Sequence, residues 1–418
     1  MIRRFCAYAV LRNLRFFDPF MVLFLLHDLQ LDYTEVGLII GYEKALTSLL
    51  EVPLAVVADR YGRRRTLVWS FVLASFAMLG LAFAERTGTP MVMVLASLAL
   101  YAVAEALRTG THKSMILDWL TRHGQRDRKV EVLGVTRAYS KTSEGASAML
   151  GGVIVWLGGA YSPLFFAAAA PTVLGAFLVA SYPRELDESD PAGVGAGEVS
   201  KESKQSKQPK QRTSVMAHLR RFAAAARRPG LLALIIPSVL FESQVKLAAS
   251  WLQPALAEGI DDMNLAVVGG IGAVVYGAWH LTSGLLAGGA SLLSTTLVRV
   301  SGGVHRALFA AHVTAAVVLG VTAAGFVGGL LAPGLVLMLG LGAVQNGRRP
   351  IFVSTVDDVM DPRWRTTTLS AENVAREVSS ALSAVALGVI ADHAGLGVAF
   401  AVMAALVGVA AVYGIGRK

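Results

Sequence analysis

Long apolar segments alternate with short polar ones along the whole chain. Roughly twelve apolar segments can be marked between Phe5 and Ile415, and each has about the 20 residues that a helix needs to cross a bilayer. A transmembrane β-barrel would instead show segments of about ten residues with alternating polarity. Because backbone polar groups in a bilayer must be hydrogen-bonded within their own segment, the pattern predicts an all-α membrane protein with twelve transmembrane helices.

A hydrophilic stretch near the middle divides the chain into two similar halves. Residues 183–214 are rich in Glu, Ser, Lys, Gln, Gly and Pro, and such a composition cannot bury enough apolar surface to fold. We therefore expect a flexible cytoplasmic linker between two six-helix bundles, residues 1–182 and residues 215–418. Apolar and basic positions in residues 215–228 predict an amphipathic helix on the membrane surface or an extension of the seventh span.

The basic residues gather in alternate loops. The sequence DRYGRRR at residues 59–65 and the segments 122–131 and 299–306 are basic, whereas the turns between them carry few Lys or Arg. Because Lys and Arg are retained on the cytoplasmic side, we expect a multi-pass protein of the bacterial cytoplasmic (inner) membrane with both termini in the cytoplasm. No Ala-x-Ala-like cleavage site follows the first apolar run, so the run is expected to be a span and not a removed signal peptide.

The composition agrees with a membrane location and argues against several classes of function. Of the 418 residues, 54% are hydrophobic and 16% are charged, against about 25% charged in a typical soluble domain. The net charge of +9 is spread over the loops, which indicates an orientation signal and not a nucleic-acid surface. Cys6 is the single cysteine, and the sequence shows no metal-ligand spacing and no nucleotide-binding loop. We therefore expect no metal, no cofactor and no enzymatic activity, with an ion gradient as the source of energy.

Ionisable side chains inside the apolar segments are the candidate functional residues. A charge at the bilayer centre costs roughly 2.5–3.5 kcal/mol or more unless it faces a cavity or a partner, so these charges require an aqueous or paired interior. Substrate binding or ion coupling is assigned to Arg15, Asp18, Glu43, Glu105, Arg108, Lys141, Glu144, Glu242, Lys246, Arg348, Glu372 and Arg376.

Some of these residues lie three or four positions apart and therefore share one face of a helix. An alternative role is a purely structural pair within one span, for which the candidates are Glu105 with Arg108, Glu242 with Lys246, and Glu372 with Arg376. Burial favours the uncharged form of a carboxylic acid, so we expect Asp18, Glu43 or Glu242 to carry a coupling proton.

The sequence DRYGRR of residues 59–64 resembles the signature loop between the second and third spans of the major facilitator superfamily, and the six-plus-six layout resembles that family over nearly the whole chain. Residues 108–118 and 349–370 resemble bacterial efflux-like members. The resemblance implies that the first, fourth, seventh and tenth spans line a central cavity. It also implies a cytoplasmic gate in which Asp59 contacts residues 367–370 and Arg63 pairs with Asp118. The residues assigned to this gate are Asp59, Arg60, Gly62, Arg63 and Asp118.

The layout of the apolar segments, the charges within them and the resemblance to the major facilitator superfamily together predict a secondary active transporter. It is expected to move a small organic solute by alternating access. We expect protons as the coupling ion and a monomer embedded in the lipid bilayer. The basic groups in the spans favour a substrate with an anionic group, and the resemblance favours export. Three alternatives stay open: an uptake permease for organic anions, a receptor or assembly scaffold that keeps the fold without transport, and a membrane-embedded enzyme.

Overall fold

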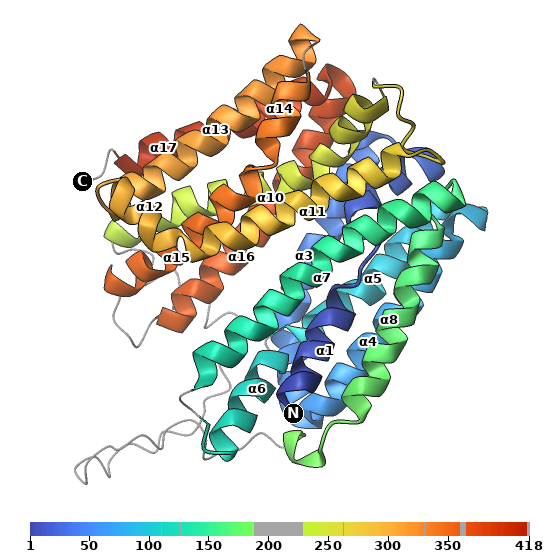
Figure 1. Ribbon diagram of the computed structural model, residues 1–418, viewed down its shortest axis with the longest axis vertical. Coiled ribbons are helices and arrows are strands. Elements are labelled where there is room, and N and C mark those ends of the chain that lie inside the picture. Colours follow the sequence, from blue (N-terminus) through green and yellow to red (C-terminus); the bar gives the residue numbers. More distant parts are fainter. Residues whose placement is uncertain are drawn as a thin grey trace.

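The computed structural model describes residues 1–109, 111–125, 128–187, 229–261, 263–329, 331–359 and 365–415. Throughout these ranges the regular structure is helical, and the helices form two groups, one from each half of the chain (Figure 1). The prediction of an all-α fold is confirmed. Residues 188–228, which include most of the predicted linker and the predicted amphipathic segment, lie outside the described ranges.

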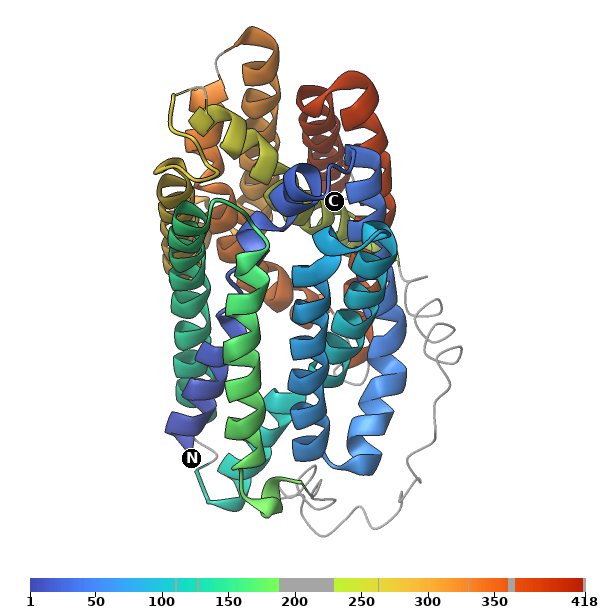
Figure 2. The same ribbon diagram turned by 90° about the vertical axis from the view of Figure 1, so that its right-hand side faces the viewer.

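The first group of helices makes six passes in chain order. Its elements are α1 (Ile2–Asn13) with η1 (Asp18–Phe20), α2 (Met21–Leu23) and η2 (Phe24–Asp28), then α3 (Tyr33–Tyr61), α4 (Arg63–Phe83) with η3 (Ala84–Arg86), α5 (Pro90–Arg108) with α6 (Thr111–Arg122), α7 (Lys129–Gly158), and α8 (Pro163–Ala180) with η5 (Arg184–Leu186). Figure 2 shows these helices, coloured blue to green, running nearly parallel to one another.

The second group makes six passes as well. Its elements are α10 (Pro229–Asp261), α11 (Gly272–Leu292) with α12 (Ser294–Val300), α13 (Val304–Gly328), α14 (Leu331–Met338) with α15 (Leu341–Val359), α16 (Arg365–Ala394) and α17 (Leu396–Ile415). Six described helices are long and apolar enough to cross a membrane alone, and α11 with α12 makes a further candidate that bends by 67°. Several of the other passes are interrupted or carry internal charges.

The first pass is interrupted in its middle. Helix α1 ends at Asn13, and helical structure resumes at η1, which contains Pro19. Proline has no backbone N–H and its ring clashes with the preceding turn, so a regular α-helix does not continue through this point. Backbone groups around the break therefore need partners from elsewhere in the fold.

The two groups of helices touch at the end opposite the loop of residues 59–65. Helix α3 packs against α16, and α7 packs against α11. Figure 1 shows α7 and α11 side by side. Glycines permit this approach: a Cβ atom on Gly37 would lie 2.5 Å from the carbonyl oxygen of Ala384, and one on Gly152 would collide with the carbonyl oxygen of Ala273. Small residues at helix crossings let the backbones approach closely.

Both halves hold the start of α3 at this closed end. Within the first half, Asp32 and Glu35 form a capping box, which satisfies backbone N–H groups that the helix itself leaves unpaired. From the second half, the Asp392 carboxylate on α16 accepts the backbone N–H groups of Tyr33 at 2.9 Å and Thr34 at 2.7 Å. The closed end is therefore fixed by polar contacts as well as by packing.

Residues 183–187, which we expected to belong to the flexible linker, are held on the first group of helices instead. Oδ1 of Asp187 accepts the backbone N–H groups of Arg64 at 3.2 Å and Arg65 at 3.4 Å, at the start of α4. Gly62 has a φ of 96°, and a Cβ atom there would collide with the same carboxylate. Glycine is therefore required at this position for both its conformation and its size.

Candidate functional site

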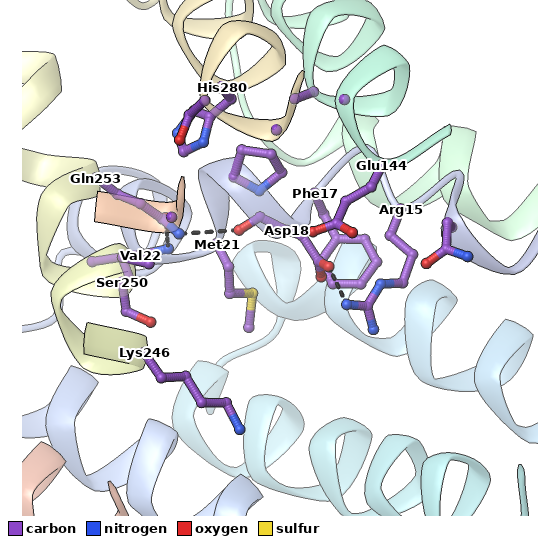
Figure 3. A pocket seen from close by; sticks show the side chains of 18 of the residues that line it. Arg15, Phe17, Asp18, Met21, Val22, Glu144, Lys246, Ser250, Gln253 and His280 are labelled. Atoms are coloured by element: carbon purple, nitrogen blue, oxygen red, sulfur yellow. Dashed lines mark hydrogen bonds and ion pairs between the residues drawn. The ribbon is translucent and has the colours of Figure 1, made fainter. Parts of the chain in front are cut away.

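A polar cavity of about 480 Å³ lies between the two groups of helices. Its polar lining comprises Asn13, Arg15, Asp18, Glu43, Lys44, Tyr101, Lys141 and Glu144 from the first half, and Lys246, Ser250, Gln253, His280, Ser283, Gln345 and Asn346 from the second. Figure 3 shows several of these side chains around one common space. The volume is typical of a small-molecule site.

The two walls of this cavity differ in charge. Six charged side chains come from the first half, and Lys246 is the one contributed by the second half among the described lining residues. The charges of the first wall form neighbouring pairs of opposite sign: Arg15 with Asp18, Lys44 with Glu43 at 3.1 Å, and Lys141 with Glu144 at 2.6 Å. The first wall is therefore nearly neutral overall, and Lys246 adds a positive charge that faces it.

Arg15 connects the cavity to charges buried behind it. It lies in the break between α1 and η1, where it pairs with Asp18 and donates to the hydroxyl of Tyr101. Its Nη1 also lies 3.5 Å from Oε1 of Glu105, which pairs with the buried Arg108 on the same helix. Arg15 therefore lies between Asp18 in the cavity wall and the Glu105–Arg108 pair on α5.

The second half supplies the partners that the broken first pass needs. The side-chain oxygen of Gln253 accepts the backbone N–H of Val22 at 2.8 Å, and its amide nitrogen donates to the carbonyl oxygen of Asp18 at 3.0 Å (Figure 3). The hydroxyl of Tyr276 donates to the carbonyl oxygen of Pro19 at 2.5 Å. These three bonds join the halves directly beside the Arg15–Asp18 pair, so the break is both a part of the cavity wall and a part of the contact between the halves.

Glu242 is buried on α10 and belongs to a network behind the cavity. Its Oε1 lies 3.0 Å from Nη1 of Arg348, and its Oε2 accepts a bond of 2.8 Å from the amide of Gln345, which lines the cavity. The guanidinium of Arg348 also lies 4.4 Å from the centre of the Phe241 ring. The alternative in which Glu242 pairs with Lys246 is wrong, because α15 packs on α10 and brings Arg348 to the carboxylate.

The alternative in which Glu372 pairs with Arg376 is wrong as well. Arg349 on α15 binds Glu372 through two bonds of 2.8 and 2.9 Å, the forked geometry that suits a guanidinium and a carboxylate. Arg376 lies 3.3 Å from Glu377, and the same carboxylate lies 2.9 Å from Nζ of Lys246. Helix packing across the second group therefore selects the partners, and spacing along one helix does not.

The structure divides the residues assigned to substrate or coupling into two sets. Those that line the cavity are Arg15, Asp18, Glu43, Lys141, Glu144 and Lys246. Those that form the pairs and networks behind it are Glu105, Arg108, Glu242, Arg348, Glu372 and Arg376. Lining residues that the assignment missed include Lys44, Tyr101, Gln253, His280 and Gln345. Within the described residues, no group of three or more His, Cys, Asp or Glu is placed to hold a metal ion.

The predicted gate is described in part. Arg63 and Asp118 form an ion pair that joins the start of α4 to α6. The side chains of Asp59, Arg60 and residues 367–370 lie outside the part of the structure that is described. The contact expected between Asp59 and the start of α16 therefore stays a prediction.

Two groups of six passes that enclose a charged cavity and meet at one end define a class of protein, the two-bundle secondary transporters. The family described as Major Facilitator Superfamily matches residues 5–384. The chain belongs to this superfamily and is a multi-pass membrane transporter, not an enzyme.

Solved structures of the same fold cover the chain from end to end. Two structures of the nucleoside transporter NupG match all of it, with TM-scores of 0.79 and 0.74, 13% identity and 99% and 98% of their own length covered. The D-xylose-proton symporter matches with a TM-score of 0.69, 13% identity and coverage of 100% of this chain and 98% of that one. The peptide transporter POT, in complex with sulfate, matches with a TM-score of 0.68, 14% identity and coverage of 100% and 92%. No curated protein sequence matches the chain.

Removing one partner of the buried Glu242–Arg348 pair is expected to destabilise the second group of helices. The substitution Arg348→Met leaves the buried Glu242 carboxylate with only the more distant Arg349, 4.0 Å away, among its described cations, and losing one partner of a buried pair costs about 3–5 kcal/mol. Chemical unfolding in detergent measures the loss. The double substitution Glu242→Gln with Arg348→Met should lose clearly less, and Arg299→Met, at an exposed position, should lose almost nothing. A loss below about 1 kcal/mol for Arg348→Met, typical of an exposed pair, would show that the network does not stabilise the bundle.

Proposed function

We propose that this protein is a proton-coupled secondary transporter that moves a small organic solute with an anionic group through the central cavity by alternating access. The observation that carries the proposal is the cavity itself, which lies between the two halves and has a charged wall on one side and Lys246 on the other. A solute bound there contacts both halves at once. Its binding energy can therefore favour one arrangement of the halves over the other.

The charge of the lining favours an anionic group. The ionisable side chains that carry positive charge are Arg15, Lys44, Lys141 and Lys246, against the carboxylates Asp18, Glu43 and Glu144. The carboxylate partner of Lys246 is Glu377, so this lysine is held in place by its own half while its side chain remains 40% exposed. An anionic group placed between Lys246 and Arg15 would interact with cations of both halves.

Asp18 is the best-placed carboxylate for proton coupling. It lies in the cavity wall beside Arg15, and its side chain is 35% exposed. An anionic solute that binds Arg15 competes with Asp18 for the same guanidinium, and a carboxylate that loses its cation and gains a neighbouring negative charge favours the protonated form. Substrate and proton are thereby linked through Arg15. Glu43 lines the same cavity, and Glu242 contacts it through Gln345, so both remain secondary candidates.

Alternating access requires two ends that open in turn. In this arrangement the halves meet opposite the loop of residues 59–65, and the bonds from Gln253 and Tyr276 lie on the closed side of Arg15. Given cytoplasmic Arg-rich loops and termini in the inner membrane, this is an inward-facing state. The gate that closes the cytoplasmic end would then comprise Asp59, Arg60, Gly62, Arg63 and Asp118.

Other features support the finer points of the proposal. One chain contributes both walls of the cavity, so a monomer is sufficient for transport. The resemblance of residues 108–118 and 349–370 to efflux-like members favours export, whereas joint binding of solute and proton beside Arg15 is symport, which an inward proton gradient drives as uptake. The solved structures of this fold include transporters named for nucleosides, xylose with protons, and peptides, which are all small polar solutes.

Thermal unfolding of the purified protein with a panel of anionic, neutral and cationic metabolites tests the substrate class. A ligand at a hundred times its Kd stabilises the folded state by about 2.7 kcal/mol, and we expect anions to raise the melting temperature. The increase should be absent in Lys246→Ala and retained in Arg299→Ala, which removes an exposed cation far from the cavity. Stabilisation by neutral or cationic compounds alone would contradict the anion assignment. Stabilising anions that are not transported in proteoliposomes would favour the scaffold alternative.

Replacing Asp18 with Asn tests the coupling. Asparagine preserves the size of the side chain but cannot take up a proton, so a pH gradient should no longer drive accumulation of the solute in proteoliposomes. Exchange of labelled for unlabelled solute should persist. Glu85→Gln, at an exposed position in η3, should keep both activities. If the pH gradient still drives full accumulation in Asp18→Asn, Asp18 is not the coupling residue, and Glu43 and Glu242 become the candidates.

A further inference from the structure

An apolar groove lies on the first group of helices, separate from the central cavity. Its volume is about 490 Å³, and its walls are formed mainly by Leu54, Val57 and Tyr61 of α3 and Arg65, Trp69 and Leu73 of α4. The exposed fractions are 63% for Tyr61 and 61% for Trp69. The groove therefore opens towards the surroundings of the bundle, where the hydrocarbon of the membrane would lie.

Polarity changes steadily along this groove. Arg65, Trp69 and Leu73 follow one another at intervals of four residues, so they share one face of α4 and span about 12 Å along its axis. On α3, Tyr61 lies level with the loop, and Val57 and Leu54 lie deeper. A charged group at the loop is thus followed by two amphipathic rings and then by aliphatic side chains. A phospholipid has the same order of phosphate, interface and acyl chain, and Trp and Tyr are enriched at that interface.

Arg65 provides the group that selects the headgroup. Its Nε lies 3.7 Å from Oδ2 of Asp187, and the Arg65 side chain is 75% exposed. An exposed ion pair of this length is weak, so it does not prevent the guanidinium from binding a phosphate, for which its forked donors are well suited. Arginine close to a membrane surface also attracts anionic lipids over neutral ones.

We propose that this groove binds one anionic phospholipid, with its phosphate on Arg65 and an acyl chain between α3 and α4. The bound lipid lies beside the loop of residues 59–65 and touches the helices on either side of it. The bound lipid would stabilise that loop, whichever solute the central cavity carries.

Quenching of Trp69 by brominated lipids tests this site. The protein is reconstituted in vesicles of unlabelled phosphatidylcholine, and a lipid with brominated acyl chains is added in increasing fractions. In one series this lipid is brominated phosphatidylglycerol, and in the other it is brominated phosphatidylcholine. The signal of Trp69 is the difference between the protein and its Trp69→Phe variant, because the chain has six tryptophans. We expect brominated phosphatidylglycerol to reach half-maximal quenching at a roughly fivefold lower fraction, the preference that one arginine near the surface provides.

Charge at residue 65 should account for this preference. Arg65→Gln is expected to make the two lipids quench equally, whereas Arg86→Gln, at the other end of the same pass, should leave the preference intact. Raising the salt to about 1 M, where the Debye length is about 3 Å, should weaken the preference in the unaltered protein. This measurement does not depend on whether a variant folds. Equal quenching by both lipids at low salt, or a full preference in a folded Arg65→Gln protein, would overturn the proposal.

Discussion

Charges placed inside apolar helices constrain the whole molecule, because a bilayer does not solvate them. The structure meets this constraint in two ways. Pairs such as Glu242 with Arg348 and Glu372 with Arg349 are buried among helices of the second half, where they hold α10, α15 and α16 together. Six charged side chains of the first half instead face the cavity, namely Arg15, Asp18, Glu43, Lys44, Lys141 and Glu144. The two halves therefore differ: buried ion pairs connect the helices of the second half, whereas ion pairs of the first half line the cavity.

The break at Pro19 links this cavity to the contact between the halves. A continuous helix would satisfy its own backbone, but an interrupted one leaves groups that Gln253 and Tyr276 of the other half bind directly. Close glycine packing at Gly37 and Gly152 completes the closed end. Because the same short segment carries Asp18, any change in the Arg15–Asp18 pair acts on a piece of backbone that the other half holds.

Much of the fold can be predicted from the sequence, but many of the ion pairs between helices cannot. Apolar segments and alternate basic loops are local properties of the chain, so the two helical groups could be predicted. The residues of the cavity wall, Arg15 and Lys246 among them, could also be found because charges within spans are costly. The partners of Glu242 and Glu372 could not, because they depend on which face of α15 packs on its neighbours. Gln253 was missed for a related reason: its role depends on a break in a distant helix.

The central claim is that the two ends of the molecule open in turn, and paired distance measurements with spin labels test it most directly. One pair of labels at Leu157 and Val268 flanks the contact of Gly159 with Gly269 at the closed end, and the other at His123 and Arg299 lies at the ends of α6 and α12. Cys6, the single native cysteine, is replaced by serine for labelling. Upon addition of a stabilising anion, at acidic and at neutral pH, the account predicts that the first distance lengthens whenever the second shortens. Distances that stay fixed under every condition, or that lengthen together, would contradict it.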